Sequence, residues 1–121
     1  MSGPYGLVQT LPQQLQAAAT TGNGGILSLR GETARLTIVI QGDGTVSSGA
    51  VQIEESYADA PPTGPAPFYT GTWSAINAPV TVTGSGAQQV VHIAGSFWHV
   101  RVRISTNIGG GGTVTVWGWG N

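Results

Sequence analysis

Hydrophobic and polar side chains alternate along most of this chain with the two-residue period of β-strands. In residues 33–41, Leu36, Ile38 and Ile40 share one face, while polar side chains and Val39 share the other. Residues 113–119 repeat the pattern, with valines inward and Thr and Trp outward. The sequence predicts long strands at 33–41, 50–55, 97–105 and 113–119, and shorter ones at 26–30, 73–76, 80–83 and 89–93.

Turn-forming residues separate these segments, and no window has a strong helical period. Gly42-Asp43-Gly44 is typical, because Gly tolerates positive φ and Asp hydrogen-bonds its own backbone. Seven or eight short strands of this kind predict an all-β fold, an antiparallel β-sandwich of jelly-roll or immunoglobulin-like type, with a barrel as the next variant. The 121 residues have room for one such domain, which we expect to span residues 22–121.

Residues 1–21 are expected to form an extended N-terminal arm. Leu11, Leu15 and Ala18 stand at helical spacing, and Pro12 suits the first turn of a short helix. A helix is nevertheless disfavoured, because no charged residue and no good capping residue supports it.

The composition excludes several classes of protein. Only 7% of the residues are charged, with four Arg, no Lys and a net charge of −1, so the chain lacks the basic face that nucleic-acid binding requires. Without cysteine, it has neither disulfides nor thiol chemistry. The N-terminus has no secretory pattern, and the unbroken apolar runs are far shorter than the roughly 20 residues of a membrane helix. We expect no nucleic-acid or membrane partner. A surface this poor in charge favours assembly with other proteins.

Candidate catalytic and metal-binding residues are few. His92 and His99 lie on different predicted strands at a spacing unlike that of zinc or EF-hand sites, and facing strands would be needed to join them. No serine lies in a nucleophile elbow. We therefore expect no enzyme activity, cofactor or metal. Glu54 and Glu55 point to opposite faces of a strand, and one of them is expected to turn inward to meet an Arg or a backbone N–H.

The outward face of the last two long strands is the strongest candidate interface. If residues 97–105 and 113–119 pair across the turn at 107–112, half of the Arg and half of the Trp residues gather on one non-core face. Arg and Trp are enriched at interface hot spots, and Arg also stacks on indole rings. The alternative is that the second sheet or the arm of the same chain covers this face. The predicted subunit interface consists of His99, Arg101, Arg103, Trp117 and Trp119.

The glycine, β-branched and aromatic pattern of residues 22–120 resembles a known protein family. The segments concerned are Gly22-Asn23-Gly24-Gly25, Gly31, Leu36–Ile40, Ser48–Ser56, Trp73–Ile76, Val100–Ile104 and Gly112–Val116. They resemble the small β-sandwich virion proteins of tailed bacteriophages, which occur as capsid decoration proteins and as modules of head or tail fibres. A longer Pro-rich loop, Asp59–Pro67, replaces the family's short Asp-Gly…Trp hairpin.

The resemblance implies a structural, multi-copy protein of the virion, made in the host cytoplasm. The expected partners are further copies of the chain, with a trimer favoured, and the major capsid protein or another virion protein. The arm would contact the capsid through Tyr5, Leu7, Leu11 and Leu15. The alternative function is a receptor- or carbohydrate-binding module of a tail fibre, in which aromatic rings around the Pro-rich loop stack on sugars. Its candidate residues are Tyr57, Asp59, Phe68, Tyr69 and Trp73.

Overall fold

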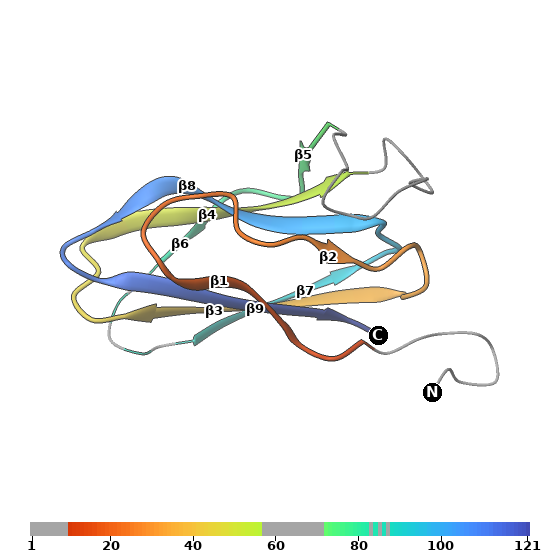
Figure 1. Cartoon of the computed structure of the whole chain (residues 1–121), viewed down its shortest axis with the longest axis horizontal. Coiled ribbons are helices and arrows are strands. Elements are labelled where there is room, and N and C mark those ends of the chain that lie inside the picture. Colours follow the sequence, from red (N-terminus) through yellow and green to blue (C-terminus); the bar gives the residue numbers. More distant parts are fainter. Residues whose placement is uncertain (1–9, 57–71, 83, 85, 87) are drawn as a thin grey trace.

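A computed structural model of the chain describes residues 10–56, 72–82, 84, 86 and 88–121. Within these ranges the protein is all-β, and none of the described residues lies in a helix, as the alternating pattern predicts (Figure 1). The nine strands are β1 (Gln13–Ala19), β2 (Leu27–Ser28), β3 (Arg35–Asp43), β4 (Ser48–Ser56), β5 (Ser74–Ala75), β6 (Val80–Thr81), β7 (Gln88–Ala94), β8 (His99–Gly109) and β9 (Thr113–Gly120).

The strands form two antiparallel sheets that stack as a β-sandwich, which confirms the predicted fold class. One sheet has four strands in the order β1-β9-β3-β7, and the other has five, ordered β2-β8-β4-β5 with β6 also paired to β4. Figure 1 shows the two layers one above the other. Eight of the nine strands coincide with predicted segments, with boundaries that differ by a few residues.

The predicted pairing of the last two long strands is wrong. β8 belongs to the five-stranded sheet and β9 to the four-stranded sheet, so the intervening turn carries the chain from one layer to the other. Gly110 and Gly111 have φ values of +89° and +88°, and a Cβ at Gly110 would lie only 2.3 Å from the carbonyl oxygen of Thr45. The β3–β4 connection, which also changes sheets, packs closely against this glycine turn. The alternation of side chains shows which residues share a face of a strand, but it does not show which other strand lies beside it.

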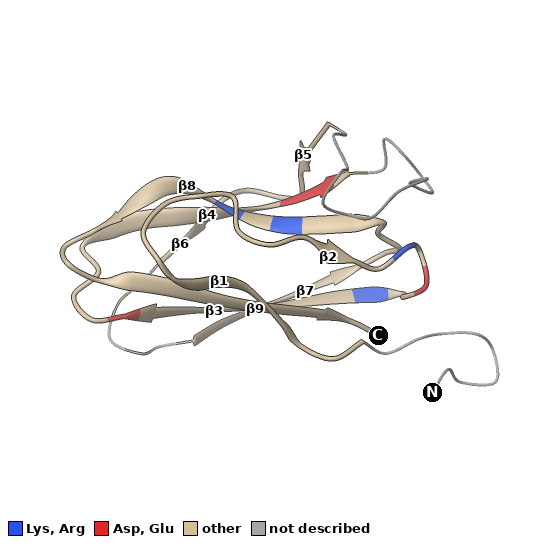
Figure 2. Cartoon of the chain, viewed as in Figure 1, with Lys and Arg blue, Asp and Glu red and all other residues tan. Residues whose placement is uncertain are grey.

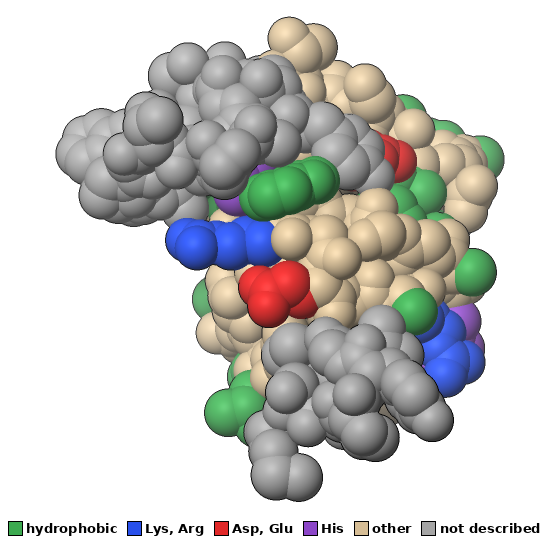
Figure 3. All heavy atoms as spheres, turned by 90° about the vertical axis from the view of Figure 1, so that its right-hand side faces the viewer, with side chains coloured by type: hydrophobic (Ala, Val, Ile, Leu, Met, Phe, Trp, Pro, Cys, Tyr) green, Lys and Arg blue, Asp and Glu red, His purple; other side chains and the backbone are tan. Residues whose placement is uncertain are grey.

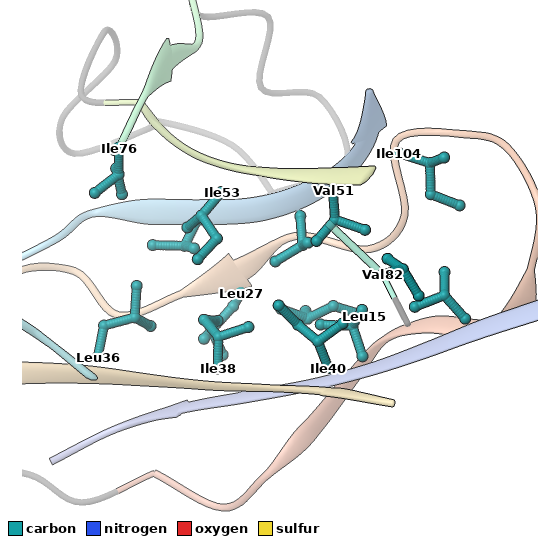
Figure 4. Packing of buried hydrophobic residues seen from close by; sticks show 14 of the residues in the cluster. Leu15, Leu27, Leu36, Ile38, Ile40, Val51, Ile53, Ile76, Val82 and Ile104 are labelled. Atoms are coloured by element: carbon teal, nitrogen blue, oxygen red, sulfur yellow. The ribbon is translucent and has the colours of Figure 1, made fainter. Parts of the chain in front are cut away.

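Aliphatic side chains from the inner faces of both sheets form one core. β3 contributes the three residues expected from its pattern, Leu36, Ile38 and Ile40, and none of them is exposed to solvent. Val51 and Ile53 of β4 approach them from the opposite sheet, and Figure 4 shows the two layers of side chains pointing toward each other. Burial of this apolar surface is the main force that holds the sheets together.

Residues 13–19 are not an arm. They form β1, which pairs with β9 at the edge of the four-stranded sheet, and Leu15 is a core residue with 2% exposure. Gly118 makes room for it, since a Cβ there would lie 2.8 Å from Leu15 Cδ1. The pairing register shifts twice within β1, and Ala18 adopts a φ of +46°. These irregularities place Leu15 and Gln16 both in buried positions, which breaks the alternation that reveals the other strands.

Candidate interaction surfaces

The five residues of the predicted interface lie on two opposite faces of the sandwich. Arg101 and Arg103 project from the outer face of the five-stranded sheet, whereas Trp117 and Trp119 project from the outer face of the four-stranded sheet. His99 is only 1% exposed. The single face that the sequence predicted is therefore not formed, because β8 and β9 lie in different sheets.

A buried carboxylate organises the outer face of the five-stranded sheet. Glu54 on β4 lies opposite Arg101 on β8, and its Oε1 accepts a hydrogen bond from Arg101 Nε at 2.8 Å. Its Oε2 accepts a bond from Arg103 Nε at 3.3 Å. The guanidinium of Arg101 lies over the ring of Trp73, 4.5 Å from the ring centroid. We call these four residues the Glu54 cluster. Of the two adjacent glutamates, Glu54 is thus the one that meets arginine, as expected, but it does so on the outer face.

Other polar groups on this face bond to the backbone or to nearby side chains. Gln52 Nε2 donates to the carbonyl oxygens of Ile76 and Asn77, at 3.3 and 3.1 Å. The ring of His99 shares a hydrogen bond of 2.9 Å between its Nδ1 and Ser28 Oγ. Gln52 therefore holds the residues that follow β5, the strand that pairs with β4 at the edge of this sheet. The polar side chains of this face bond within the chain itself.

The outer face of the four-stranded sheet carries an exposed apolar row. The strand register places Trp117 of β9 beside Val39 of β3, and Val39 beside Val90 of β7. Trp117 is 39% exposed and Val90 is 53% exposed, whereas Val39 between them is half-buried. We call these three residues the Trp117 row. An apolar strip of this kind is open to contact with another molecule.

Uncharged polar side chains flank the Trp117 row on both sides. On one side, Thr37 lies between Trp119 and His92, and its Oγ1 hydrogen-bonds His92 Nδ1 at 3.0 Å. On the other side, Gln88 Nε2 donates to Gln41 Oε1 at 3.0 Å. The middle of this face thus contains no Asp, Glu, Lys or Arg.

Four further charged side chains, those of Arg30, Glu32, Arg35 and Asp43, lie toward the two ends of the sandwich (Figure 2). Arg35 and Asp43 occupy the first and last positions of β3, and Figure 2 shows them at opposite ends of the four-stranded sheet. Arg30 and Glu32 belong to a turn closed by the Glu32 N–H donating to the Leu29 carbonyl at 3.0 Å. Figure 3 looks onto this end of the molecule, where acidic, basic and hydrophobic side chains are mixed.

The residues predicted for the capsid-contact arm and the alternative ligand loop do not come together in one site. Leu11, from the expected capsid-contact arm, is 87% exposed, directly after Thr10, whose N–H donates to the carbonyl of Gly120 at 2.8 Å. Trp73, from the alternative ligand loop, belongs to the Glu54 cluster. Leu15, also expected to contact the capsid, is instead buried in the core. The other members of the two sets lie outside the described residues: Tyr5, Leu7, Tyr57, Asp59, Phe68 and Tyr69.

The described part of the chain contains no group of three or more His, Cys, Asp or Glu residues that could hold a metal ion. Its two histidines are on different sheets, His92 on β7 and His99 on β8, so the facing-strand arrangement that would join them is not formed. In the ranges described, no helix has the length and apolar character to cross a membrane.

Comparisons of this chain with protein-family models, with curated proteins and with solved structures find no match. Its function therefore has to be inferred from its own surfaces. The Trp117 row could not be found from the sequence, because its three residues become neighbours only through the order of three strands in the sheet. The outward position of Val39 is visible in the alternation of residues 33–41, but its neighbours Trp117 and Val90 come from strands distant in sequence.

Proposed function

We propose that this chain is a structural protein without catalytic activity, and that it attaches to a repeated protein lattice in the particle of a tailed bacteriophage. It would act as a capsid decoration or head-fibre subunit, made in the host cytoplasm and retained in the virion. The resemblance of residues 22–120 to small virion β-sandwiches supports this role. The observation that carries it is the exposed outer face of the four-stranded sheet, which has no charge in its middle and has the Trp117 row at its centre.

That face suits attachment to a protein lattice for physical reasons. Trp is among the residues most enriched at interface hot spots, and burying Trp117 and Val90 against a partner would contribute hydrophobic free energy. Without charges in the middle of the face, no ion has to be stripped of water when the surfaces meet. Many copies bound to one particle also gain from multivalency if they are joined to one another, so that a modest affinity at each site is sufficient.

The test uses particles of the encoding phage from which the gene for this chain has been deleted. Purified protein is mixed with these particles, and the fraction that sediments with them is measured. We expect wild-type protein to co-sediment at a fixed ratio of copies per particle, and the double variant Trp117→Ser, Val90→Ser to lose most of this binding. Arg103→Gln, on the opposite face, serves as the control and should bind like the wild type. Protein that stays in the supernatant, or a double variant that binds equally well, would contradict the proposal.

The fibre-tip alternative receives less support. Of its five candidate residues, the structure describes only Trp73, and Arg101 stacks on that ring. A sugar-binding platform needs an open aromatic face, which this contact reduces. A glycan array distinguishes the two functions, because a lattice-binding subunit should give no signal on it.

A further inference from the structure

Three of the four edges of the two sheets are defended against pairing with another chain. Exposed edge strands otherwise offer free N–H and C=O groups to any neighbouring strand. Beside β8, the segment 16–22 covers the edge of the five-stranded sheet: Ile104 N–H donates to Gly22 O at 2.9 Å, and Gln16 Nε2 donates to Val102 O at 2.8 Å. At the opposite edge, β5 and β6 have only two residues each.

The outer edge of β1 is defended by its irregular backbone. Its pairing with β9 shifts register between Gln14 and Gln16 and again between Gln16 and Ala19. Ala18 has a left-handed φ of +46°. A second strand could not form a continuous ladder with a backbone that changes direction in this way.

β7, in contrast, is a regular edge strand without such a defence. It pairs with β3 through seven consecutive residues without a register shift, from Gln41↔Gln88 to Arg35↔Ala94. It contains no proline, no glycine and no charged side chain. Among the residues that the structure describes, its other edge has no partner strand.

The hydrogen bonds at the start of β3 establish which residues of β7 point their backbone groups outward. Arg35 and Asn121 bond to each other in both directions, so the N–H and C=O of Arg35 face β9. Because backbone groups alternate in direction along a strand, the N–H and C=O of Leu36 point toward β7, where Leu36 pairs with Ile93. The hydrogen bond from Gly95 N–H to Ala34 O agrees with this assignment, in which the odd-numbered residues of this segment face β3. The β7 residues left with outward-pointing N–H and C=O groups are Gln88, Val90, His92 and Ala94.

We propose that β7 pairs with β7 of a second copy of this chain, antiparallel about a two-fold axis at Val91. The four outward-pointing residues are symmetric about this position. Val90 of one copy would lie opposite His92 of the other, and Gln88 opposite Ala94, with each opposed pair exchanging two hydrogen bonds. The two four-stranded sheets would become one continuous sheet of eight strands.

The side chains and charges along β7 and β3 favour a second copy of the chain as the partner. Because β7 carries no charge, two copies can approach without repulsion between identical groups. Arg35 and Asp43 lie at opposite ends of β3, so an antiparallel pair places one Arg35 and one Asp43 at each end of the joined sheet and brings no like charges together. Val90, which is 53% exposed at the edge, gains the His92 ring of the second copy as a neighbour on the outer face.

The edges also decide the number of copies. A strand that pairs with itself about a two-fold axis forms a closed dimer. A cyclic trimer built by strand addition would have to join β7 to a different edge, and that edge, β1, is irregular. The structure therefore favours a dimer through β7 over the trimer expected from the sequence. This pairing does not depend on the proposed lattice role: it uses backbone groups at the edge of β7, whereas the lattice role uses the side chains of the Trp117 row, and Val90 alone belongs to both contacts.

The first test is the solution mass by light scattering behind a sizing column, from about 5 to about 500 µM, since a contact along seven residues of edge is small and should be weak. The mass should rise from 12.3 kDa toward twice that value. Val90→Lys places a charge at the new contact. His92→Pro removes an outward N–H and keeps the backbone bonds to β3, although it also removes the side-chain bond of His92 to Thr37. Each should weaken dimerisation at least about tenfold. Gln14→Lys, on the other edge of the sheet, is the matched control, and urea unfolding checks that all variants fold.

Amide hydrogen exchange measured by NMR tests directly which N–H groups of β7 enter the new contact. Exchange at the four outward residues should slow as the protein concentration rises, whereas exchange at Gln89, Val91 and Ile93, which bond to β3, should stay constant. A mass of 12.3 kDa at every concentration, a trimer, or a dimer that His92→Pro leaves intact would overturn the proposal. A monomer that still sediments with phage particles would overturn this pairing and leave the lattice role in place, so the two proposals fail independently.

Discussion

The two outer faces of this sandwich use their side chains in opposite ways. On the five-stranded sheet, Glu54 bonds two arginines, Arg101 covers Trp73, and Gln52 is bonded to backbone carbonyls. On the four-stranded sheet, Trp117 and Val90 remain exposed on a surface without charges in its middle. The face richer in arginine is thus the one whose groups are already paired, and the face poorer in charge is the one available to a partner.

This difference separates stability from association. A buried carboxylate must be paired, because an uncompensated charge away from water is costly. Substitutions in the Glu54 cluster should therefore lower the stability of the isolated chain and leave partner binding intact. Trp117 and Val90 in the Trp117 row are partly in contact with water, so substitutions there should affect binding and lower the unfolding free energy less than substitutions in the Glu54 cluster.

The largest effect is expected from Glu54→Gln. The substitution keeps the shape but removes the charge that holds Arg101 and Arg103, and the loss should be about 2 kcal/mol of unfolding free energy. Most of it comes from Arg101, because Arg103 is 37% exposed and its ion pair is screened by solvent. The measurement is urea unfolding followed by tryptophan fluorescence. Glu55→Gln, one position along the same strand, is the control, and equal losses in the two variants would argue against the cluster as a stabilising unit.

A smaller effect is expected from exchanging tryptophan for leucine on each face. Trp73→Leu removes the ring beneath the Arg101 guanidinium and should cost about 1 kcal/mol of unfolding free energy. The matched variant Trp117→Leu should cost less, since its ring is 39% exposed and contacts no cation in the described structure. Thermal unfolding of the two variants in parallel gives the comparison. A larger loss for Trp117→Leu would reverse the roles assigned to the two faces.

The smallest effect is expected from Val90→Thr. Threonine keeps the β-branched shape that suits a strand, and Val90 is 53% exposed, so the unfolding free energy should change by less than about 0.5 kcal/mol. Sedimentation with phage particles should nevertheless weaken, because part of the Trp117 row becomes polar. Unfolding and sedimentation are measured on the same preparation. A marked loss of stability would mean that the row is structural rather than available for binding.

Long and regular strands could be predicted from the sequence. A strand with bulges, and any feature that depends on which strands are neighbours, could not. β3, β8 and β9 alternate over seven or more residues, so their positions and inner faces follow from period two alone. β1 was not predicted as a strand, because its bulges place Leu15 and Gln16 in consecutive buried positions. The strand period carries no information about which strands are neighbours, and for this reason β8 and β9 were predicted to pair.

The same limit applies to the candidate sites. The pairing of one glutamate with arginine could be expected, because a carboxylate within a strand needs a partner. The contact between Trp73 and Arg101 could not, since it depends on where the segment after residue 71 meets the sheet. The Trp117 row likewise requires the order β9-β3-β7, which brings together residues 39, 90 and 117.

The position of β9 has a consequence for how the chain is made. β9 spans residues 113–120 and lies between β1 and β3, so it joins the earliest described strand to the rest of its sheet. While the ribosome still holds these residues, the four-stranded sheet lacks its second strand, and Leu15 has no glycine surface to pack on. The apolar side chains of β1 and β3 that pack around β9 then stay uncovered until β9 has left the ribosome. Contacts between residues about one hundred positions apart also form slowly. Synthesis of this protein therefore includes an interval in which a chaperone, or a neighbouring nascent chain, can reach surfaces that the finished sandwich conceals.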